Sequence, residues 1–317
     1  SKPSAPAAYT TEVDSDSAGQ RLDNFLLREL KGVPRTHVYR LIRSGQVRVN
    51  SGRVRASYRL EPGDTVRVPP VSQRARLKPA AVEEGLQWLE RHVLYEDSRI
   101  LVLDKPAGMA VHSGSGVSLG CIEALRCLRP KLTGMDLVHR LDRDTSGCLL
   151  VAKRRSALRA LHGVLREGGM EKRYLALVMG NWQHGARTVD VPLLRQRDGS
   201  GPSVRVAEGG KPAESRFRVV EFYGRDATLM EVTIPTGRTH QIRVHAAYMG
   251  HPIAGDPRYG DAGFNERMRG MGLERMFLHA HAISFTWPGS DEPFMVSAPL
   301  PDDLRNVQQR LQQRDKA

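Results

Sequence analysis

The sequence has few cysteines and no hydrophobic run long enough to cross a membrane. Three cysteines, Cys121, Cys127 and Cys148, occur among 317 residues, and their odd number and spacing support neither a disulfide framework nor a zinc ribbon. No hydrophobic signal segment opens the chain either. These absences argue against a disulfide-stabilised secreted scaffold and a membrane-spanning protein, so we expect a cytoplasmic protein that does not bind membranes.

Acidic residues are scarce relative to basic ones. The chain has 48 Lys and Arg against 35 Asp and Glu, which gives a net charge of +13. Such a surplus favours a polyanionic partner, nucleic acid before any other. The length allows one large domain and a small one.

Patterns that bind metals or cofactors are missing as well. His240 and His245 lie close together, as do His279 and His281, but no H-E-x-x-H or similar pattern accompanies them. Phosphate-binding loops and nucleophile elbows are also missing from the sequence. We therefore expect neither a metal nor a cofactor.

Composition separates a leader from a small first domain. Residues 1–13 are rich in Ser, Ala and Pro without periodicity, which predicts a flexible leader. Residues 14–80 predict a small α+β domain, because apolar residues recur at helical spacing within 20–43. Alternating valines at 47–49 and 66–68 predict short strands joined by turns.

A larger second domain follows a linker. We expect the linker at residues 81–92 and the second domain over 93–317. Apolar residues 100–103 predict a buried strand, and 186–235 predicts several alternating strands. Residues 301–314 predict a terminal helix.

The first domain carries much of the positive charge. Between residues 21 and 68 there are eleven Lys and Arg against four Asp and Glu, a surplus of seven. On the second predicted helix, Arg35, Arg40 and Arg43 lie opposite the apolar face, where they could contact phosphates. A solvated surface is the alternative, but the shortage of interspersed acids favours contact with nucleic acid.

The most densely charged loop is Val138–Gly147, which reads V-H-R-L-D-R-D-T-S-G and runs straight into an apolar strand. A charged loop that leads into a buried strand places its side chains at a sheet edge, where sites are often built. Asp142 is the first candidate for catalysis. The alternative is a purely structural turn, because Asp, Ser and Gly are ordinary turn residues.

Two later segments carry further candidates. Tyr174 stands beside two cations at the start of a predicted strand, although a lone Tyr is more often a core residue. Thr239 is placed to cap a helix that holds Arg243 in its first turns. A partly buried Arg requires a carboxylate partner, because its guanidinium stays charged.

These motifs resemble known families. The run R-L-D-N-F-L to S-G-Q-V-R-V-N within residues 20–80 resembles an S4-type RNA-binding domain. H-R-L-D-R-D-T-S-G, D-K-P-A-G, K-R-Y-L-A-L-V, G-R-T-H-Q-I-R-V-H and L-H-A, in this order, resemble the RluA-type pseudouridine synthases. The resemblance implies an α+β fold in which a large mixed, mostly antiparallel sheet with flanking helices follows the S4-like domain.

The resemblance also implies residue roles and a substrate. Asp142 matches the aspartate nucleophile that acts on a flipped-out nucleotide, and Arg243 matches the arginine that pairs with it. Tyr174 matches the tyrosine that stacks on uracil, for which service as a base is a further implied role. Arg140 matches the side chain that fills the space left by the flipped base. The implied substrate is uridine in large-subunit (23S) ribosomal RNA, and the expected oligomeric state is a monomer.

Three more basic residues are expected near the RNA, and two other functions stay open. We expect His139, Lys105 and Lys172 to contact RNA as well. The modified uridines are left open, as is the choice between attack at ribose C1′ and at the uracil ring. The alternatives to a synthase are a non-catalytic RNA-binding factor and a metal-dependent nuclease that uses Asp142 and Asp144.

Overall fold

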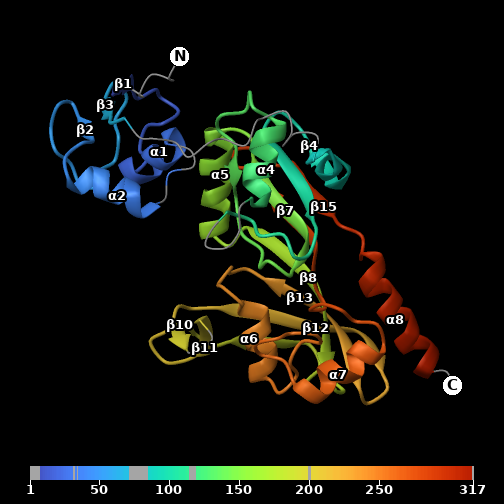
Figure 1. The fold of residues 1–317 in the computed structure, drawn as a ribbon. Coiled ribbons are helices and arrows are strands. Elements are labelled where there is room, and N and C mark those ends of the chain that lie inside the picture. The colour runs from blue at the N-terminus through green and yellow to red at the C-terminus, as the bar shows by residue number, and fades with distance from the viewer. Residues whose placement is uncertain are drawn as a thin grey trace. The chain divides into compact units, whose positions relative to one another are not determined.

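The computed structural model describes residues 8–30, 33, 35–70, 85–113, 119–198 and 201–315, apart from the side chains of 35, 36, 197, 198, 201 and 202. The chain divides into two compact units, Ser1–Glu84 and Gly85–Ala317 (Figure 1). Each unit has its own hydrophobic core. The two units are therefore described separately.

The first unit is a small three-stranded sheet with two helices. Its elements are β1 (Tyr9–Glu12), α1 (Leu22–Glu29), α2 (Arg35–Arg43), β2 (Arg48–Val49) and β3 (Thr65–Val68). The strands are antiparallel in the order β1-β3-β2. Leu22 and Leu26 of α1 pack against Val38 of α2 and Val66 of β3 in one buried cluster. The predicted pair of helices and the predicted valine strands are confirmed.

The structure corrects the predicted leader. Residues 9–12 are strand β1, which pairs with β3 from Tyr9↔Val68 to Glu12↔Thr65. Val13, which follows β1, is buried. The backbone groups at the edge of β3 and the apolar core beneath Val13 order this segment, and composition alone does not reveal either partner. Residues 1–7 lie outside the described residues.

The second unit is built on a ten-stranded sheet. Eight strands follow the order β4-β5-β7-β14-β8-β13-β12-β9, while β15 pairs with β14 and β6 pairs with β7. The strands are β4 (Val93–Glu96), β5 (Ile100–Lys105), β6 (Asp136–Leu137), β7 (Ser146–Ala152), β8 (Met170–Met179), β9 (Arg187–Asp190), β12 (Glu214–Tyr223), β13 (Ala227–Ile234), β14 (Leu278–Thr286) and β15 (Pro293–Ser297). A separate hairpin consists of β10 (Leu193–Asp198) and β11 (Gly201–Val206).

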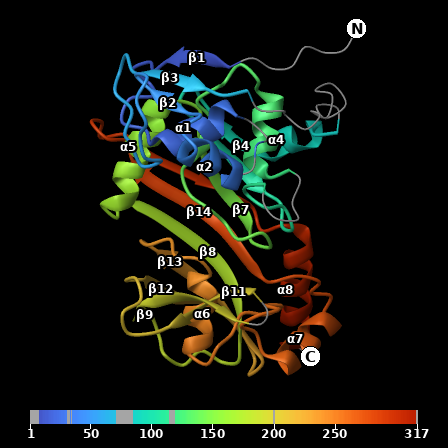
Figure 2. The ribbon, with the colours of Figure 1, turned by 60° about the vertical axis from the view of Figure 1, so that its left-hand side comes forward.

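The pairing of these strands confirms the predicted fold class. Among the described strands of the large sheet, β7 and β14 run parallel and the other pairs run antiparallel. The long strands β8 and β14 lie side by side through the middle of the unit (Figure 2). The sheet is thus mixed and mostly antiparallel.

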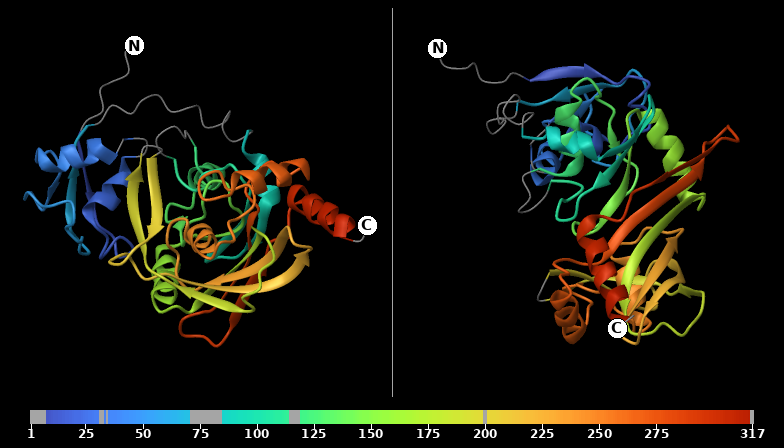
Figure 3. Two further views of the ribbon diagram at one scale, coloured as in Figure 1. Left: turned by 90° about the horizontal axis from the view of Figure 1, so that it is seen from below. Right: turned by 90° about the vertical axis from the view of Figure 1, so that its right-hand side faces the viewer.

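Helices cover this sheet at both ends. They are the 3-10 helix η1 (Gln87–His92), α4 (Cys121–Leu128), α5 (Arg155–Arg166), α6 (Gln241–Tyr248), α7 (Ala262–Gly270) and α8 (Asp302–Asp315). Leu161 of α5 packs in a cluster with Leu150 of β7, and Leu304 of α8 packs in another with Leu177 of β8. Figure 3 shows β12 and β13 along one side of the unit and α6 and α7 on the other.

The second unit begins earlier than the sequence suggested. Leu89 of η1 is fully buried, so the end of the predicted linker at 81–92 belongs to the folded unit. Apolar burial orders this segment, although its mixed charges are typical of a linker. Residues 81–84 lie outside the described residues.

A glycine allows the central parallel pair to form. Gly147 has φ +105°, and a Cβ atom there would lie 2.3 Å from the carbonyl oxygen of Ala280 in β14. Only glycine, which lacks a Cβ atom, can occupy position 147 while β7 lies this close to β14. The loop that precedes Gly147 is thereby held over the middle of the sheet, where β14 neighbours β8.

Candidate active site

A pocket of about 710 Å³ lies where the loop 138–145 meets β8 and the segment 234–243. The pocket is within the usual size range of small-molecule sites, roughly 300–1,000 Å³. Asp142, Tyr174 and Arg243, which come from three distant parts of the sequence, all line it. The structure therefore brings the three predicted catalytic residues together.

Arg243 joins two carboxylates. Its Nη1 donates a hydrogen bond of 3.1 Å to Oδ2 of Asp142. Its Nε and Nη2 donate to Oδ2 and Oδ1 of Asp256 at 2.7 and 2.8 Å. The guanidinium side chain is 9% exposed and that of Asp256 is fully buried, whereas that of Asp142 is 25% exposed. Arg243 is thus held from behind by Asp256 and offers one donor to the more exposed Asp142.

Asp256 was missed by the sequence analysis, which expected a single carboxylate partner for Arg243. The backbone N–H groups of Arg258 and Tyr259 also donate to Asp256, at 2.9 and 3.1 Å. A guanidinium carries five donors in a fixed fork, so one bidentate carboxylate cannot satisfy them all. That excess of donors was the signal for a second acid, and Asp256 lies only 13 residues downstream of Arg243.

The charges of this triad are stabilised by one another. Burial by itself raises the pKa of Asp256. The hydrogen bonds and charge of Arg243, together with the two backbone N–H groups, lower this pKa by more than burial raises it, so the carboxyl is ionised. Burial opposes the charge of Arg243, and the two carboxylates more than offset it and raise its pKa. A permanent cation therefore lies beside Asp142.

The two oxygens of Asp142 have different surroundings. Oδ2 accepts the hydrogen bond from Arg243. Within the part of the chain that the structure describes, no hydrogen bond reaches Oδ1. One oxygen is thus anchored, and the other is available to a ligand in the pocket.

The loop that carries Asp142 is fastened by the D-K-P-A-G segment. Lys105 is fully buried, and its Nζ donates to the carbonyl oxygens of Pro106, Met109 and Arg143 at 2.8, 2.8 and 2.9 Å. The backbone N–H of Gly108 donates to the same Arg143 oxygen at 2.9 Å. Lys105 therefore uses its donors to hold the residue next to Asp142.

Comparison with known proteins identifies the architecture around this pocket. The RNA pseudouridylate synthase family matches residues 99–248, and the S4 domain matches residues 20–66. A protein of Escherichia coli O157:H7 named ribosomal large subunit pseudouridine synthase C is 53% identical and aligns with 98% of this chain and 98% of its own. The chain belongs to the RNA pseudouridylate synthase family. It is therefore an enzyme, an isomerase, as the sequence predicted.

Two further similarities agree with this assignment. A protein of the same name from Pasteurella multocida (strain Pm70) is 52% identical over 93% of this chain and 91% of its own. The solved structure of human RNA pseudouridylate synthase domain containing 4 superposes with a TM-score of 0.61 at 24% identity, covering 74% of this chain and 97% of that one. The second similarity concerns the fold alone.

Lys172 faces the pocket of the synthase beside Tyr174. The two residues are two positions apart on β8, so their side chains lie on the same face of the strand, and both line the pocket. Lys172 is 4% exposed, and among the described residues its Nζ has neither a hydrogen-bond acceptor nor an ion-pair partner. Burial, with a contribution from the charge of Arg238, lowers its pKa to about 8. The ammonium is thus available to an anion that enters the pocket.

The predicted RNA contacts differ in their exposure. Arg140 is exposed at the pocket, as a contact residue should be. Lys105 is enclosed and bonded to backbone carbonyls, so its ammonium cannot reach RNA in this structure. Sequence alone cannot separate these cases, because a Lys in a turn is ordinarily exposed.

The predicted contact residue His139 also points inward. Its Nε2 accepts a hydrogen bond of 3.1 Å from the backbone N–H of Leu150 in β7. Burial, and then the charge of Lys172, lower its pKa to about 3, so the ring is neutral. His139 therefore holds β7 against the loop and offers no positive charge to a phosphate.

His279 of the L-H-A motif is a structural residue. Its ring bridges the Ser146 hydroxyl, 2.9 Å from Nδ1, and the Ala298 carbonyl, 3.2 Å from Nε2. Burial lowers its pKa to about 4, which keeps it neutral. Among the described residues no group of three His, Cys, Asp or Glu side chains is arranged to hold a metal ion.

The start of α6 differs from the sequence prediction. Thr239 was expected to cap this helix, but the N-cap residue is His240, which has φ 55° in the left-handed region. Gln241 accepts hydrogen bonds from Thr236 and from the backbone N–H of Arg238, and donates to Glu214. This buried amide fixes the segment before α6 to β12, and it determines where His240 lies.

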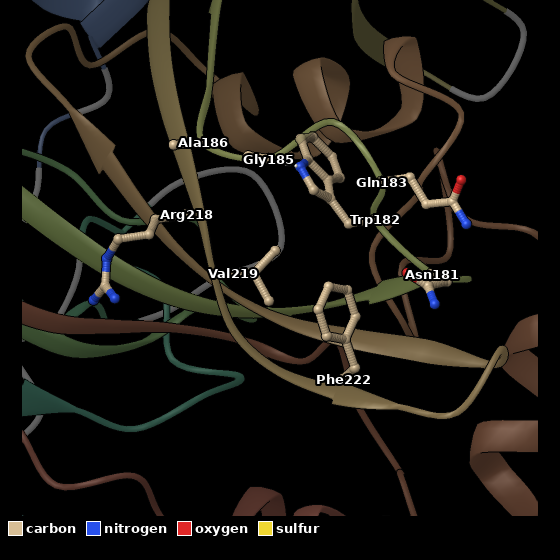
Figure 4. Close-up of a pocket in the computed structure, with 8 residues that line it drawn as sticks. All are labelled: Asn181, Trp182, Gln183, Gly185, Ala186, Arg218, Val219 and Phe222. Carbon is tan, nitrogen blue, oxygen red and sulfur yellow. Dashed lines mark hydrogen bonds between the residues drawn. The ribbon is translucent and has the colours of Figure 1, made fainter.

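A second hollow, of about 460 Å³, lies over β12 and the β8–β9 connection (Figure 4). Trp182, Val219 and Phe222 form its apolar part, and Arg218 lies at one side. Trp182 is buried, and its indole N–H donates to the carbonyl oxygen of Gly185. No carboxylate or imidazole lines this hollow, so acid–base chemistry is not expected there.

The predicted cations of the first unit lie on its surface. Arg40 and Arg43 of α2 are exposed, while Val38 and Leu41 of the same helix are buried. The side chain of Arg35 lies outside the described residues. Among the described helices of either unit, none is both long and apolar enough to cross a bilayer.

Proposed function

We propose that this synthase converts uridine to pseudouridine at specific sites in large-subunit (23S) ribosomal RNA. The names of its E. coli and P. multocida relatives, which align with nearly the whole chain, support this substrate. The basic net charge and the exposed arginines of α2 support a polyanionic partner.

The observation that carries the proposal is the arrangement around Asp142. Its Oδ2 is held by Arg243, its Oδ1 accepts no hydrogen bond from the described residues, and Asp142 and Tyr174 line the same pocket. A carboxylate that is paired with a guanidinium through one oxygen and has the other oxygen unoccupied is suited to attack an electron-poor carbon or to stabilise one. We propose that Asp142 acts at ribose C1′ of a flipped-out uridine.

The reaction rearranges one bond and conserves all atoms. The bond between C1′ and N1 of uracil breaks, the base rotates, and a bond forms between C1′ and C5. The proton of C5 is lost and N1 gains one, so no oxidant or other reactant is consumed. The carboxylate of Asp142 carries the sugar between the two bonds and is then released unchanged.

The detached base must be retained while it rotates. Tyr174 is 5% exposed at the pocket, and its ring offers an aromatic face on which uracil can stack. Burial, and then the charge of Asp142, raise the pKa of its hydroxyl, so the phenol stays neutral in the free enzyme. These properties support stacking as the role of Tyr174.

Binding of the substrate requires the nucleotide to leave its stack, which costs a few kcal/mol. Arg140 at the pocket can occupy the vacated space, and Lys172 can pair with a phosphate of the extruded nucleotide. Contacts of Arg40 and Arg43 with the RNA backbone add affinity that does not depend on sequence.

The decisive test replaces Asp142. Asp142→Asn and Asp142→Ala should abolish pseudouridine formation in ribosomal RNA from cells that lack the gene, as mapped by carbodiimide-stop primer extension. RNA affinity should persist, because Asp142 adds no positive charge. The matched control is Asp144→Asn, which changes an exposed carboxylate two residues away and should retain activity. Turnover by an Asp142 variant would disprove the proposed role.

The same assay separates the alternatives. A non-catalytic RNA-binding factor would bind ribosomal RNA and leave every uridine unchanged. A nuclease that used Asp142 and Asp144 with a metal would cleave RNA and stop when EDTA is added. The synthase should modify uridine in the presence of EDTA. The expected monomeric state stays a prediction that sedimentation velocity checks.

A further inference from the structure

The residue on which this inference rests is His240, whose backbone is unusual. It precedes α6 with φ 55° and ψ 20°, a left-handed conformation that few residues other than Gly adopt. Such a conformation persists only where the surroundings impose it, and it often marks a functional position. His240 lines the pocket, and its side chain is 19% exposed.

Hydrogen bonds outside the pocket favour one of the two neutral tautomers of His240. The backbone N–H of Val204 donates to the Tyr259 hydroxyl at 2.9 Å, and this hydroxyl lies 2.9 Å from Nδ1 of His240. Since Val204 can only donate, Nδ1 is the acceptor that these contacts leave for the Tyr259 hydrogen. The neutral imidazole then carries its hydrogen on Nε2.

The neutral state is favoured by the position of the ring. Burial lowers the pKa of His240, and Arg243 lowers it as well, whereas Asp142 acts in the opposite direction. The guanidinium of Arg243 already neutralises the nearby carboxylate through its hydrogen bond. Nε2–H is therefore a neutral donor at the edge of the pocket.

This donor points toward Asp142 without bonding to it. Nε2 lies 4.0 Å from Oδ2 of Asp142, which is too long for a hydrogen bond. A hydroxyl oxygen placed about 2.8 Å from each atom would bridge the gap. It would accept from Nε2–H and donate to the carboxylate, and a hydroxyl is a neutral group that can do both.

We propose that His240 recognises the 2′-hydroxyl of the target nucleotide by this bridge. The inference rests on the proposed function, in which Asp142 acts at C1′, because the 2′-hydroxyl is carried by the adjacent carbon. The hydroxyl distinguishes RNA from DNA. His240 is thus a residue that selects ribose and places C1′ against Oδ1 of Asp142.

The first test pairs a change in the enzyme with a change in the substrate. The substrate is a synthetic RNA hairpin around a uridine mapped as above, with ribose or 2′-deoxyribose at that nucleotide only. The deoxy substitution should lower kcat/KM of the wild type about tenfold more than that of His240→Ala, which corresponds to about 1.4 kcal/mol of coupling. The deoxy substitution also changes the intrinsic reactivity of the sugar, but this change affects both enzymes equally. It therefore cancels when the two losses in kcat/KM are compared. Equal losses would overturn the inference.

The second test separates recognition from a structural role. The Nε2 of Gln can reach the position of the His Nε2, whereas Asn is shorter but fits the left-handed backbone better. We expect His240→Gln to recover more of the ribose preference than His240→Asn. Better recovery by Asn would indicate a backbone role and contradict the inference. His184→Ala, which changes an exposed histidine outside this pocket, is the control.

The third test does not depend on activity. Nitrogen-15 NMR of the imidazole rings should show Nε2 of His240 protonated and Nδ1 not, with the signals assigned by their loss in His240→Gln. Tyr259→Phe removes the hydroxyl that donates to Nδ1, so it should increase the fraction of His240 that is protonated at Nδ1. Protonation of Nδ1 in the wild type would refute the arrangement. If restoring the wild-type gene to cells that lack it restored no pseudouridine in ribosomal RNA, that result would instead refute the proposed function.

Discussion

The cations of the two units do different work. Arg40 and Arg43 of the first unit stand on an exposed helix face, and among the described residues no acid pairs with either. Lys105 and Arg243 of the second unit are buried, and each is bonded to oxygen atoms of the protein itself. The first pair is open to an external anion, and the second pair fixes the loop that carries Asp142 and Asp142 itself.

In this protein, burial more than charge decides what a basic residue does. A surface cation stays hydrated and contributes to RNA binding in a salt-dependent way. A buried cation must be satisfied by acceptors of the protein, because a charge without partners in the interior is costly. Lys172 lies between these extremes, buried but facing the pocket without a partner among the described residues.

The largest expected effect comes from Arg243, the cation that works inside the protein. Arg243→Lys keeps a positive charge but places it on one nitrogen, which cannot reproduce the bidentate pair with Asp256 together with the bond to Asp142. We expect kcat to fall about 10²–10³-fold, as it does elsewhere when an aligned donor is removed. Single-turnover rates on the mapped hairpin measure this. An unchanged rate would mean that a positive charge alone suffices at this position. It would contradict the claim that Arg243 acts through its hydrogen bonds inside the protein.

The next effect concerns Lys105 and should appear in stability. Lys105→Met keeps the apolar length but removes the lysine donor from three carbonyl oxygens, of which only that of Arg143 keeps another donor, the Gly108 N–H. We expect the free energy of unfolding to fall by about 2–4 kcal/mol, as measured by urea denaturation. RNA affinity should change less than twofold in a filter-binding assay. A large loss of affinity with unchanged stability would instead support the RNA contact that was predicted from the sequence.

A smaller effect is expected from the exposed arginines. The double variant Arg40→Gln and Arg43→Gln should weaken RNA binding about tenfold at moderate salt and lower the salt slope by roughly 1.4–1.8, since each phosphate contact contributes about 0.7–0.9. The value of kcat at saturating RNA should stay the same. The same two changes at Arg267 and Arg269, exposed on α7, are the control and should have little effect on binding.

The smallest effect is a pH dependence that originates at Lys172. Because burial lowers its pKa to about 8, the free enzyme loses this charge as the pH rises from 7 to 9. RNA affinity should therefore fall a few-fold over this range, beyond any fall seen in Lys172→Arg, whose guanidinium stays charged. Fluorescence anisotropy at constant ionic strength measures both. If RNA affinity fell with pH in the same way for both proteins, Lys172 would not contact RNA, as Lys105 does not.

Local patterns predicted most of the secondary structure. Apolar spacing indicated α1 and α2, alternating valines indicated β2 and β3, and the apolar runs at 100–103 and 148–152 indicated β5 and β7. Strand β1 was missed because a short polar segment becomes a strand only when it finds a free edge, which for residues 9–12 is β3. Leu89 was missed because one apolar residue in a charged stretch does not reveal what covers it.

The site was predictable in part. Asp142 was a candidate from its charged loop alone, and the resemblance to a family gave Asp142, Tyr174 and Arg243 their roles. Spacing alone did not bring the three residues together. Asp256 and Tyr259 were missed, because their partners Arg243 and His240 lie on another segment. His240 was passed over because a left-handed helix cap at a non-glycine residue has no clear sequence signature.

The sequence by itself determined the two-part organisation, the excess of positive charge and the residue types of the active site. These are properties of composition and of short periodic patterns, in which each residue acts with its neighbours. Only the tertiary structure decided that Lys105 and His139 face inward, that Asp256 holds Arg243, and that Nε2 of His240 points toward Asp142. These arrangements depend on which strands pair across the sheet and which polar groups are sealed from water, and both join residues far apart in the chain.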